Sequence, residues 1–409
     1  MLFKSMLAKM VHHGTIRLVD AEGKTETCGT GEEPSCTIRL HRKSLEWSLA
    51  LNPALRVPEA YMEGTLTVDE DLRHVLHIIF SNYGSLESQA LFQATNQFLR
   101  QTRRLKQFNP VGKAQKNVAH HYDLSGELYD YFLDSDRQYS CAYFTDPDNS
   151  LEQAQEDKKR HIASKMLLNE PGLKVLDIGS GWGGMGLYLS KIANCDVTGV
   201  TLSVEQHSLS EKRAAEAGLQ NRCHFRLDDY RNVEGPFDRI VSVGMFEHVG
   251  KGNYHEFFAK VRDLLDDNGV CLLHTIGRLD QPAPINPFIR KYIFPGADLP
   301  SLSEATNVIE QSGLITTDIE ILRLHYAETL RHWYERFQKH RKDVARIYDE
   351  RFCRMWEMYL AGCEMGFRYE GLAVFQIQLA KNLEAVPLTR DYMYEWENNT
   401  RSVGMRAAE

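Results

Sequence analysis

Short apolar runs alternate with stretches of helical periodicity over residues 174–276. The apolar runs predict strands at residues 174–178, 196–201, 222–227, 237–243 and 269–276. The stretches between them predict helices at residues 184–193, 204–217 and 253–265. Such alternation is typical of right-handed βαβ units, which build a mostly parallel sheet covered by helices. We therefore predict a doubly wound, Rossmann-like α/β domain, whose ligands bind at the carboxyl ends of the strands.

The alternation ends after residue 276. A loop at residues 281–300 is studded with prolines and aromatic residues, and a short helix and a strand are expected at 306–311 and 313–322. Residues 325–365 are strongly helical in pattern, and a last strand at 372–381 precedes a polar tail. The helical block is therefore expected to be an insert before the final strand.

The chain ahead of this domain predicts a smaller α/β module. Strands are expected at 14–19, 36–40 and 65–68, a strand or short helix at 44–51, and a turn-bounded piece at 58–64. A helix is expected over 69–80, with Asp69 as its N-cap, and a second helical stretch over 86–106. Pro110 and Gly112 predict a linker. The expected organisation is an N-terminal module at 1–106, a linker at 107–116 and the main domain at 117–395.

Composition narrows the class of protein. The chain has 409 residues, of which 43% are hydrophobic and 25% charged, as in ordinary globular proteins of about two domains. Its net charge of -8 gives no reason to expect nucleic acid as a partner. No stretch approaches the roughly 20 apolar residues of a membrane span, and the N-terminus lacks the apolar core of a secretory signal. The eight cysteines form no Cys-x-x-Cys pair, so we expect free thiols in a cytoplasmic protein, without a disulfide framework or a metal site.

The most informative stretch is KVLDIGSGWGGMG at residues 174–186. Its glycines allow a sharp turn and a close approach to a ligand, and the helix beyond them begins with unpaired N–H groups. The spacing also fits the weak dinucleotide fingerprint G-x-G-x-x-G. However, Asp177 precedes the glycines, and the next strand ends in Thr201–Ser203, without the acidic residue that binds a ribose. The pattern is that of S-adenosylmethionine-dependent methyltransferases. A tight turn without a ligand is the alternative, although so many glycines would then cost backbone entropy without a return.

Further motifs follow the predicted strand ends or flank the domain core. They are Tyr139–Phe144, Gly199–Ser203 with Gln206, Asp229–Arg231, Ser242–Gly250, Leu273–Ile276 and His325–Ala327 with Leu330. With these motifs and Val175–Gly184, the chain resembles the cyclopropane-fatty-acyl-phospholipid synthases and the related mycolic acid cyclopropane synthases. The resemblance covers nearly the whole chain, including the segment EAYMEG at residues 59–64 of the N-terminal module. It implies a class I methyltransferase domain with a helical insert and an N-terminal lipid-binding-like domain.

The resemblance also implies a reaction and its site. The methyl group of S-adenosylmethionine is transferred to the cis double bond of a phospholipid acyl chain, and a bound bicarbonate ion serves as the base when the cyclopropane ring closes. The implied cofactor-binding residues are Tyr139, Ser140, Asp177, Gly179, Gly181, Thr201, Leu202, Gln206, Asp229 and Tyr230. The implied bicarbonate pocket consists of Cys141, Glu247, His274, Ile276 through its backbone, and Tyr326. Cys363 aligns with a cysteine proposed as a nucleophile in the family, but this reaction needs none, so packing is its favoured role.

The chemistry of these side chains suits that reaction. An alkene is a poor nucleophile, so the methyl donor must be held in line and water excluded. Glu247 can accept a hydrogen bond from the bicarbonate hydroxyl, and His274 and Tyr326 can donate to its oxygens. Each residue also has a purely structural alternative: Glu247 as a helix cap, His274 as a core histidine and Tyr326 as packing.

Other functions and the mode of lipid contact stay open. An acyl-chain methyltransferase that leaves a methyl or methylene branch, a small-molecule N-methyltransferase and a non-catalytic lipid-binding protein are the alternatives. Contact with a membrane phospholipid is expected to be peripheral, at the inner face of the membrane. The loop at 281–300 is the favoured contact, through Phe288, Ile289, Tyr292, Ile293 and Phe294. Basic residues of the helical block could add contacts or merely balance nearby acids: Arg331, Arg336, Lys339, Arg341, Lys342 and Arg346. The N-terminal module is expected to add lipid contacts or to pair subunits of a homodimer.

Overall fold

The structure, a computed structural model, describes residues 2–82 and 126–406. Its internal contacts divide the chain into two compact units. Unit 1 comprises residues 1–106, 283–295 and 327–372, and unit 2 comprises residues 107–282, 296–326 and 373–409. The predicted helix at 86–106 and the linker at 107–116 lie outside the described residues. The predicted domain boundaries are therefore not tested.

Unit 2 contains the predicted alternation of strands and helices. In chain order its elements are α8 (Gly126–Phe132), α9 (Leu151–Ser164), β5 (Lys174–Ile178), α10 (Gly184–Ala193), β6 (Asp196–Thr201), α11 (Val204–Glu216), β7 (Cys223–Leu227), η1 (Tyr230–Asn232), β8 (Phe237–Val243), η2 (Phe246–His248), η3 (Lys251–Asn253), α12 (Tyr254–Leu264), β9 (Leu265–Arg278), α13 (Leu302–Ser312), β10 (Ile315–Leu322), β11 (Leu372–Ala380), η5 (Leu383–Ala385) and α16 (Asp391–Arg406).

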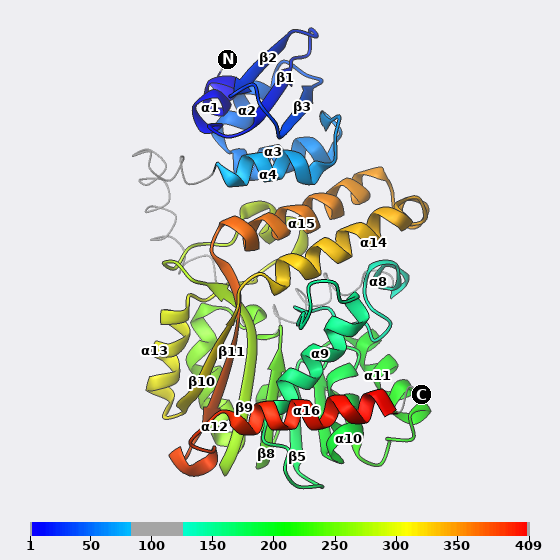
Figure 1. The fold of residues 1–409 in the computed structure, drawn as a ribbon, viewed down its shortest axis with the longest axis vertical. Helices are drawn as coiled ribbons and strands as arrows, with labels where there is room; N and C mark the ends of the chain where they lie inside the picture. The colour runs from blue at the N-terminus through cyan, green and yellow to red at the C-terminus, as the bar shows by residue number, and fades with distance from the viewer. Residues whose placement is uncertain (1, 83–125, 407–409) are drawn as a thin grey trace. The chain divides into compact units, whose positions relative to one another are not determined.

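The strands of unit 2 form one sheet in the order β10-β11-β9-β8-β5-β6-β7 (Figure 1). β5 pairs in parallel with β6 and β8, and the parallel pairing continues to β7 and β9. β10 and β11 pair antiparallel. The predicted doubly wound fold is confirmed. Because the carboxyl ends of β5, β6, β7 and β8 meet at one edge, the polar residues that follow these strands come together there.

Apolar side chains cover both faces of this sheet. Successive residues of β5 alternate between them: Val175 belongs to one buried cluster, and Leu176 to the other. The first cluster includes Met185 and Leu189 of α10. Burial on both faces explains why the parallel strands are almost continuously apolar in the sequence.

The residues at the end of the chain form helix α16, where a polar tail was expected. Met393 is buried, and Trp396 packs against the apolar cluster that contains Leu189. A carboxylate oxygen of Glu397 lies 2.5 Å from Nδ1 of His161 in α9. The buried face of α16 is narrow, and most residues of this helix are polar. The hydrophobic pattern of the sequence therefore did not predict the helix.

Unit 1 combines the N-terminal module with the helical insert. Its elements are α1 (Leu2–Met10), β1 (Thr15–Val19), β2 (Thr25–Gly29), β3 (Ser35–Leu40), α2 (Leu45–Leu51), α3 (Pro53–Met62), β4 (Leu66–Val68), α4 (Leu72–Ser81), the π-helix η4 (Ile289–Ile293), α14 (His325–Ile347) and α15 (Glu350–Tyr369). The strands form a sheet in the order β2-β1-β3-β4, with β1 and β3 parallel. Its core includes Phe3, Ile16 and Ile38. The Tyr61 hydroxyl donates to Glu357 of α15 at 2.9 Å, so the insert contacts the module within this unit.

Helix α1 was not predicted, and three other elements of unit 1 also differ from the predictions. The predicted turn-bounded piece at 58–64 is largely helix α3, in which Pro58 is internal and Ala60 and Met62 are buried. β2 was not predicted, because Cys28 is its one fully buried residue and the strand shows little alternation. The N-cap of α4 is Asp71, which accepts a hydrogen bond from the Arg73 N–H at 2.8 Å. Asp69 instead forms an ion pair with Arg39.

Part of the aromatic loop is packed within unit 1. Phe288 and Ile293 are 2% and 1% exposed. The hydroxyl of Tyr292 donates to Glu59 at 2.9 Å, and the ring of Phe294 packs edge-on against Tyr359. Burial excludes Phe288 and Ile293 from a membrane-docking surface. Ile289, Tyr292 and Phe294 are half-buried, and for these three side chains the expected membrane contact stays a prediction.

Several basic residues of α14 balance acidic neighbours. Arg331 pairs with Glu328 and Glu335, and Arg341 pairs with Glu350 and Glu357. Arg346 pairs with Asp343. These ion pairs favour the structural alternative for three of the six basic residues considered as lipid contacts. Within residues 2–82 and 126–406, no helix combines the length and the apolar character needed to cross a membrane. All eight cysteines are free thiols, as expected.

Candidate active site

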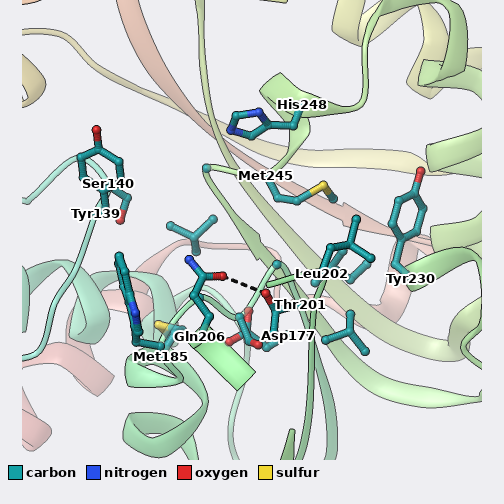
Figure 2. Close-up of a pocket in the computed structure, with 18 of the residues that line it drawn as sticks. Tyr139, Ser140, Asp177, Met185, Thr201, Leu202, Gln206, Tyr230, Met245 and His248 are labelled. Atoms are coloured by element: carbon teal, nitrogen blue, oxygen red, sulfur yellow. Dashed lines mark hydrogen bonds between the residues drawn. The ribbon is translucent and has the colours of Figure 1, made fainter. Parts of the chain in front are cut away.

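One pocket at the carboxyl edge of the unit 2 sheet brings the predicted cofactor-binding residues together (Figure 2). Its lining includes all ten of them: Tyr139, Ser140, Asp177, Gly179, Gly181, Thr201, Leu202, Gln206, Asp229 and Tyr230. They come from the last residues of β5 and β6, from the turns after β5, β6 and β7, from the start of α11 and from the segment ahead of α9. The pocket therefore depends on the sheet, which aligns segments that are far apart in the sequence.

The glycine turn after β5 forms the floor of the pocket. Gly179, Gly181 and Gly183 have φ angles of +82°, +54° and +83°, which favour glycine. A Cβ at Gly179 would lie 2.7 Å from the side chain of Met245, so the glycine permits close packing there. A Cβ at Gly181 would meet no protein atom within 4 Å. The backbone at Gly181 thus borders open space, where a ligand can approach it.

Asp177, near the end of β5, is 2% exposed. Burial raises the pKa of its carboxyl group to about 7, although Lys158 and the N–H of Gly186 act in the opposite direction. Its Oδ2 atom has no hydrogen-bond partner among the described residues. A buried oxygen without a partner costs free energy, and a cationic or N–H donor would satisfy it. The amino group of S-adenosylmethionine is such a donor, so this side chain fits the expected cofactor.

Thr201 and Gln206 form a second polar wall. The Thr201 hydroxyl donates to the amide oxygen of Gln206 at 2.8 Å, and Ser203 caps α11 by accepting from the Gln206 N–H. Because the amide oxygen is engaged, the amide nitrogen of Gln206 is turned away from Thr201 and points into the pocket (Figure 2). This wall thus presents a hydrogen-bond donor, which suits the hydroxyl oxygens of a ribose.

Asp229 and Tyr230 stand at the end of β7. The Asp229 carboxylate accepts hydrogen bonds from the backbone N–H and the guanidinium of Arg231, at 2.6–3.0 Å. The Asp229 carboxylate therefore caps η1 and stabilises the turn, and its oxygens are engaged by Arg231. Tyr230 lies across the pocket from Tyr139 in Figure 2, and its ring packs edge-on against Phe257 at 5.5 Å. This fixed ring can act as a wall for a flat group such as adenine.

Helices α8 and α9 hold the segment that carries Tyr139 and Ser140. The ring of Tyr139 packs edge-on against Tyr129 of α8 at 5.5 Å. Lys158 of α9 is fully buried, and its ammonium donates to the Ser140 hydroxyl at 2.9 Å and to Gln138 at 2.5 Å. Burial lowers the pKa of Lys158 to about 8, although Asp134 partly offsets this effect. Lys158 was not predicted, since a charged residue in a helix usually faces solvent.

Sequence reasoning also missed part of the pocket lining. The missed residues include Arg137, Gln138, Trp182, Met185, Asp228, Met245 and His248. Met245 and His248 belong to a quoted motif and follow β8, so their place at a strand end was a usable signal. Burial lowers the pKa of His248 to about 4, so its ring is neutral at pH 7.

Glu247 is the centre of the second predicted site. It lies in η2 and is 4% exposed, and its Oε1 accepts a hydrogen bond of 2.5 Å from the backbone N–H of Ile276. Burial raises the pKa of its carboxyl group to about 7, partly offset by that N–H. Its Oε2 has no hydrogen-bond partner among the described residues. The N–H of Ile276 thus orients Glu247, which differs from the predicted direct contact between this backbone group and bicarbonate.

His274 lies two residues before Ile276 on β9, so both side chains point to the same face of the sheet. It is 2% exposed, and burial lowers the pKa of its ring well below the usual value. Its Nδ1 lies 3.2 Å from the amide nitrogen of Gln376, whereas its Nε2 has no partner among the described residues. Unit 2 thus buries two polar side-chain atoms of the predicted bicarbonate pocket, in Glu247 and His274, that lack partners among the described residues, as Asp177 Oδ2 of the predicted cofactor site does.

The other predicted catalytic residues have different environments. Cys141 is buried directly after Ser140, and Tyr326 is buried near the start of α14. Both belong to unit 2, as Glu247 and His274 do. Cys363 belongs to unit 1, and burial raises the pKa of its thiol to about 12. A thiol with so high a pKa is protonated at pH 7, which favours packing over a nucleophilic role.

Comparison with known proteins identifies the family. A family model described as mycolic acid cyclopropane synthetase matches residues 111–377, and a model of a domain of unknown function matches residues 2–90. The chain is 35% identical over 380 residues to a probable fatty acid methyltransferase of Pseudomonas putida, across 89% of this chain and 93% of that protein. It is 42% identical over 264 residues to the cyclopropane-fatty-acyl-phospholipid synthase of Escherichia coli K12, across 64% and 67%.

A solved structure agrees with these matches. The mycolic acid cyclopropane synthase CmaA1, in a complex with SAH and CTAB, gives a TM-score of 0.62 at 33% identity, over 66% of this chain and 99% of that one. SAH, S-adenosylhomocysteine, is what remains of S-adenosylmethionine after methyl transfer. The glycine turn, the class I methyltransferase fold and these matches lead to one conclusion. The chain belongs to the cyclopropane synthetase family and is an S-adenosylmethionine-dependent methyltransferase.

Proposed function

We propose that this enzyme transfers the methyl group of S-adenosylmethionine to the cis double bond of an unsaturated phospholipid acyl chain and forms a cyclopropane ring, with bicarbonate as the base. The observation that carries the proposal is the pair of buried atoms without partners, Glu247 Oε2 and His274 Nε2. Each buried polar atom without a partner needs an explanation, and a bound ion is one that would satisfy both of these atoms. Ring closure requires a base near the transferred methyl group, and a small polar anion meets both needs.

The two side chains fit bicarbonate in their hydrogen-bonding capacity. Glu247 Oε2 can accept from the hydroxyl, and Nε2 of a neutral histidine can donate to an anionic oxygen. The N–H of Ile276 holds Glu247 at its other oxygen and so keeps Oε2 in one orientation. When bound, S-adenosylmethionine supplies the electrophilic methyl group and bicarbonate supplies the base.

The chain's own residues also keep water away. Cys141, Glu247 and His274 are all less than 5% exposed. A carbocation formed from an alkene would react with water, so exclusion of water protects the product. Gly181 and Asp177 are proposed to position the methyl donor, through the open backbone at Gly181 and the unpartnered oxygen of Asp177.

Analysis of the lipid product tests this proposal. The enzyme is incubated with vesicles of a cis-unsaturated phospholipid and labelled S-adenosylmethionine, with bicarbonate either supplied or depleted. We expect fatty acids that have gained one CH₂ group and resist mild hydrogenation, and we expect the rate to fall when bicarbonate is depleted. Label in a chain that still takes up hydrogen would instead indicate a methylene branch.

A branching acyl-chain methyltransferase is the second candidate function. The Pseudomonas relative is named a fatty acid methyltransferase, and the match to it covers both chains almost completely. The same product analysis separates the two functions. A methylene branch takes up hydrogen and a ring does not, whereas a saturated methyl branch also resists hydrogenation but carries two more hydrogen atoms than the ring and is distinguished by its mass.

We further propose that the protein reaches its lipid by peripheral contact through the N-terminal module. Trp47 and Leu51 of α2 are 68% and 78% exposed. The basic residues Arg42 and Lys43 precede this helix, and Lys43 forms an exposed ion pair with Glu22. Exposed apolar groups beside cationic ones suit the headgroup layer of an anionic membrane. Homodimer formation and a location at the inner face of the membrane remain predictions.

A further inference from the structure

Buried polar side chains of unit 2 lie directly behind His274. Gln376 on β11 and Lys165, the C-cap of α9, are 0% and 2% exposed. The amide nitrogen of Gln376 lies 3.2 Å from Nδ1 of His274. The ammonium of Lys165 lies 2.6 Å from the amide oxygen of Gln376. The three side chains thus form a continuous line of hydrogen bonds that ends at the candidate base site.

The chemistry of the three groups determines where their hydrogens lie. The Lys165 ammonium can only donate, so the atom that faces it must be the amide oxygen of Gln376. The amide nitrogen therefore faces His274, and since it also can only donate, Nδ1 of His274 must accept. A neutral imidazole carries one N–H, which is then on Nε2.

The environment keeps this ring neutral. Burial lowers the pKa of His274 well below its usual value, and the positive charges of Lys158 and Lys165 act in the same direction. Nε2 is buried and has no partner among the described residues. It is therefore an N–H donor that lacks an acceptor in this part of the chain.

Lys165 is itself held in place. Glu320 pairs with its ammonium, and the same carboxylate oxygen lies 2.7 Å from Nε2 of His161. Burial alone would raise the pKa of Glu320, but the hydrogen bond and charge of His161, with the charge of Lys165, lower it to about 2. The ionised carboxylate keeps the ammonium beside Gln376 and so prevents rotation of the amide.

We propose that Gln376 and Lys165 are positioning residues that hold His274 in the Nε2–H tautomer, so that it donates to an anion in the candidate base site. This inference rests on the proposed function, because the anion is the bicarbonate proposed there. In the other tautomer, the lone pair of Nε2 would face the anion, and a hydrogen bond would become a repulsion. Outer groups that fix a histidine tautomer act in the same way at metal sites.

The variant Gln376→Glu tests the inference. A carboxylate of the same shape still accepts from Lys165, but it offers His274 an acceptor in place of a donor. Because burial still disfavours a charged ring, the single proton should move from Nε2 to Nδ1. The tautomer is measured in the protein without cofactor, by two-bond ¹H–¹⁵N correlation of labelled histidine, with the His274 signal assigned through His274→Asn.

Gln378→Glu is the matched control. Gln378 is also buried on β11, two residues further along, and its amide donates to the backbone oxygen of Lys165 at 2.6 Å and to the Tyr392 hydroxyl at 2.8 Å. Its hydrogen bonds do not include His274. The control should therefore leave Nδ1 unprotonated.

Lys165→Met is a second test variant, for use if Gln376→Glu does not fold. It removes the group that orients the amide of Gln376, so it should give a mixture of His274 tautomers.

Two readouts decide the matter. We expect Gln376→Glu to switch the tautomer and to raise the apparent KM for bicarbonate by about tenfold or more, while S-adenosylmethionine affinity measured by calorimetry stays unchanged. A protonated Nδ1 in the wild type, or an unchanged tautomer in Gln376→Glu, would overturn the proposal. A switched tautomer with unchanged bicarbonate dependence would overturn the role in anion binding. If the wild type needs no bicarbonate, the proposed function is wrong, and so is the proposed role of His274 in binding the anion. The tautomer measurement would still show whether Gln376 determines which nitrogen of His274 carries the proton.

Discussion

At Gly181 the backbone has a φ of +54°, and an added Cβ would enter open space in the cofactor pocket. We expect Gly181→Val to reduce S-adenosylmethionine affinity by at least about tenfold, because the branched side chain takes the space of the cofactor. Calorimetry measures the affinity, and circular dichroism checks the fold. The positive φ adds strain of about 1–2 kcal/mol, which has to be separated from the loss of binding.

Gly218 provides the control for that strain. It lies in unit 2 with a φ of +69°, and a Cβ there also meets no atom within 4 Å, but it does not line the pocket. Gly218→Val should therefore cost similar stability and leave cofactor affinity unchanged. Equal affinities in the two variants would show that the pocket is not the cofactor site.

The buried carboxyl group of Glu247 should make stability depend on pH. Its pKa is about 7 in the folded protein, against 4.5 when unperturbed. Because folding favours the protonated form, its contribution is fully present below pH 4.5 and is lost as the pH rises through about 7. The shift corresponds to about 3 kcal/mol.

Comparison with Glu247→Gln isolates this effect. Urea unfolding is measured over the same pH range without cofactor or bicarbonate, and the variant lacks the titrating group. The free energy of unfolding of the wild type, relative to the variant, should fall as the pH rises from about 4.5 to 7. A constant difference between the two proteins across this range would contradict the raised pKa.

At the scale of elements, the start of α4 shows how tertiary contacts choose between equivalent signals. Asp69 and Asp71 both precede the apolar face of the helix, and either is a suitable N-cap by residue type. In the structure Asp71 caps the helix and also accepts a hydrogen bond from the Tyr334 hydroxyl of α14. The second contact comes from a distant part of the chain, so the sequence could not favour Asp71.

Asp71→Ala should lower the free energy of unfolding by about 1–2 kcal/mol, because the first turn of α4 loses its cap. Urea unfolding followed by circular dichroism measures the change. Asp69→Ala is the control: its side chain forms an exposed ion pair with Arg39, and such pairs contribute little to stability because solvent screens them. If Asp69→Ala lowered the free energy of unfolding more than Asp71→Ala does, Asp69 rather than Asp71 would be the N-cap of α4.

At the scale of the whole molecule, the question is which surface would make the proposed membrane contact. Phe288 and Ile293 of the predicted aromatic loop cannot take part because they are buried. Trp47 and Leu51 of α2 in the N-terminal module are the most exposed of the apolar side chains considered above. We expect the double variant Trp47→Ser with Leu51→Ser to bind anionic phospholipid vesicles less tightly, while S-adenosylmethionine affinity stays unchanged.

Vesicle sedimentation at several salt concentrations measures this binding. Leu388→Ser is the control, because Leu388 is also fully exposed but belongs to unit 2. Added salt should weaken binding of the wild type if Arg42 and Lys43 contribute through their charge. Undiminished sedimentation of the double variant would move the contact surface away from α2.

The sequence alone determined the α/β architecture of unit 2 and ten residues of its pocket. Strands and helices between residues 174 and 276 were predicted because parallel strands bury both faces and the helices bury one stripe, so local hydrophobic periodicity reports them directly. The ten pocket residues were found because they belong to contiguous motifs, most of them at strand ends, that resemble those of a known family. Resemblance to a known family supplied their proposed roles.

Some features depend on contacts between residues that are distant in the sequence, and only the tertiary structure decided these. Helix α16 is polar in pattern and is stabilised through Trp396 and Glu397, and α3 continues through Pro58 because Ala60 and Met62 are buried. The line from Lys165 through Gln376 to His274 joins residues of α9's end, β11 and β9. A hydrogen bond between such residues exists only after the strands have paired, because its strength depends on distance and burial. The local sequence pattern contains neither the distance between two such residues nor their burial. These contacts, and the tautomer of His274 that they impose, are therefore visible only in the folded chain.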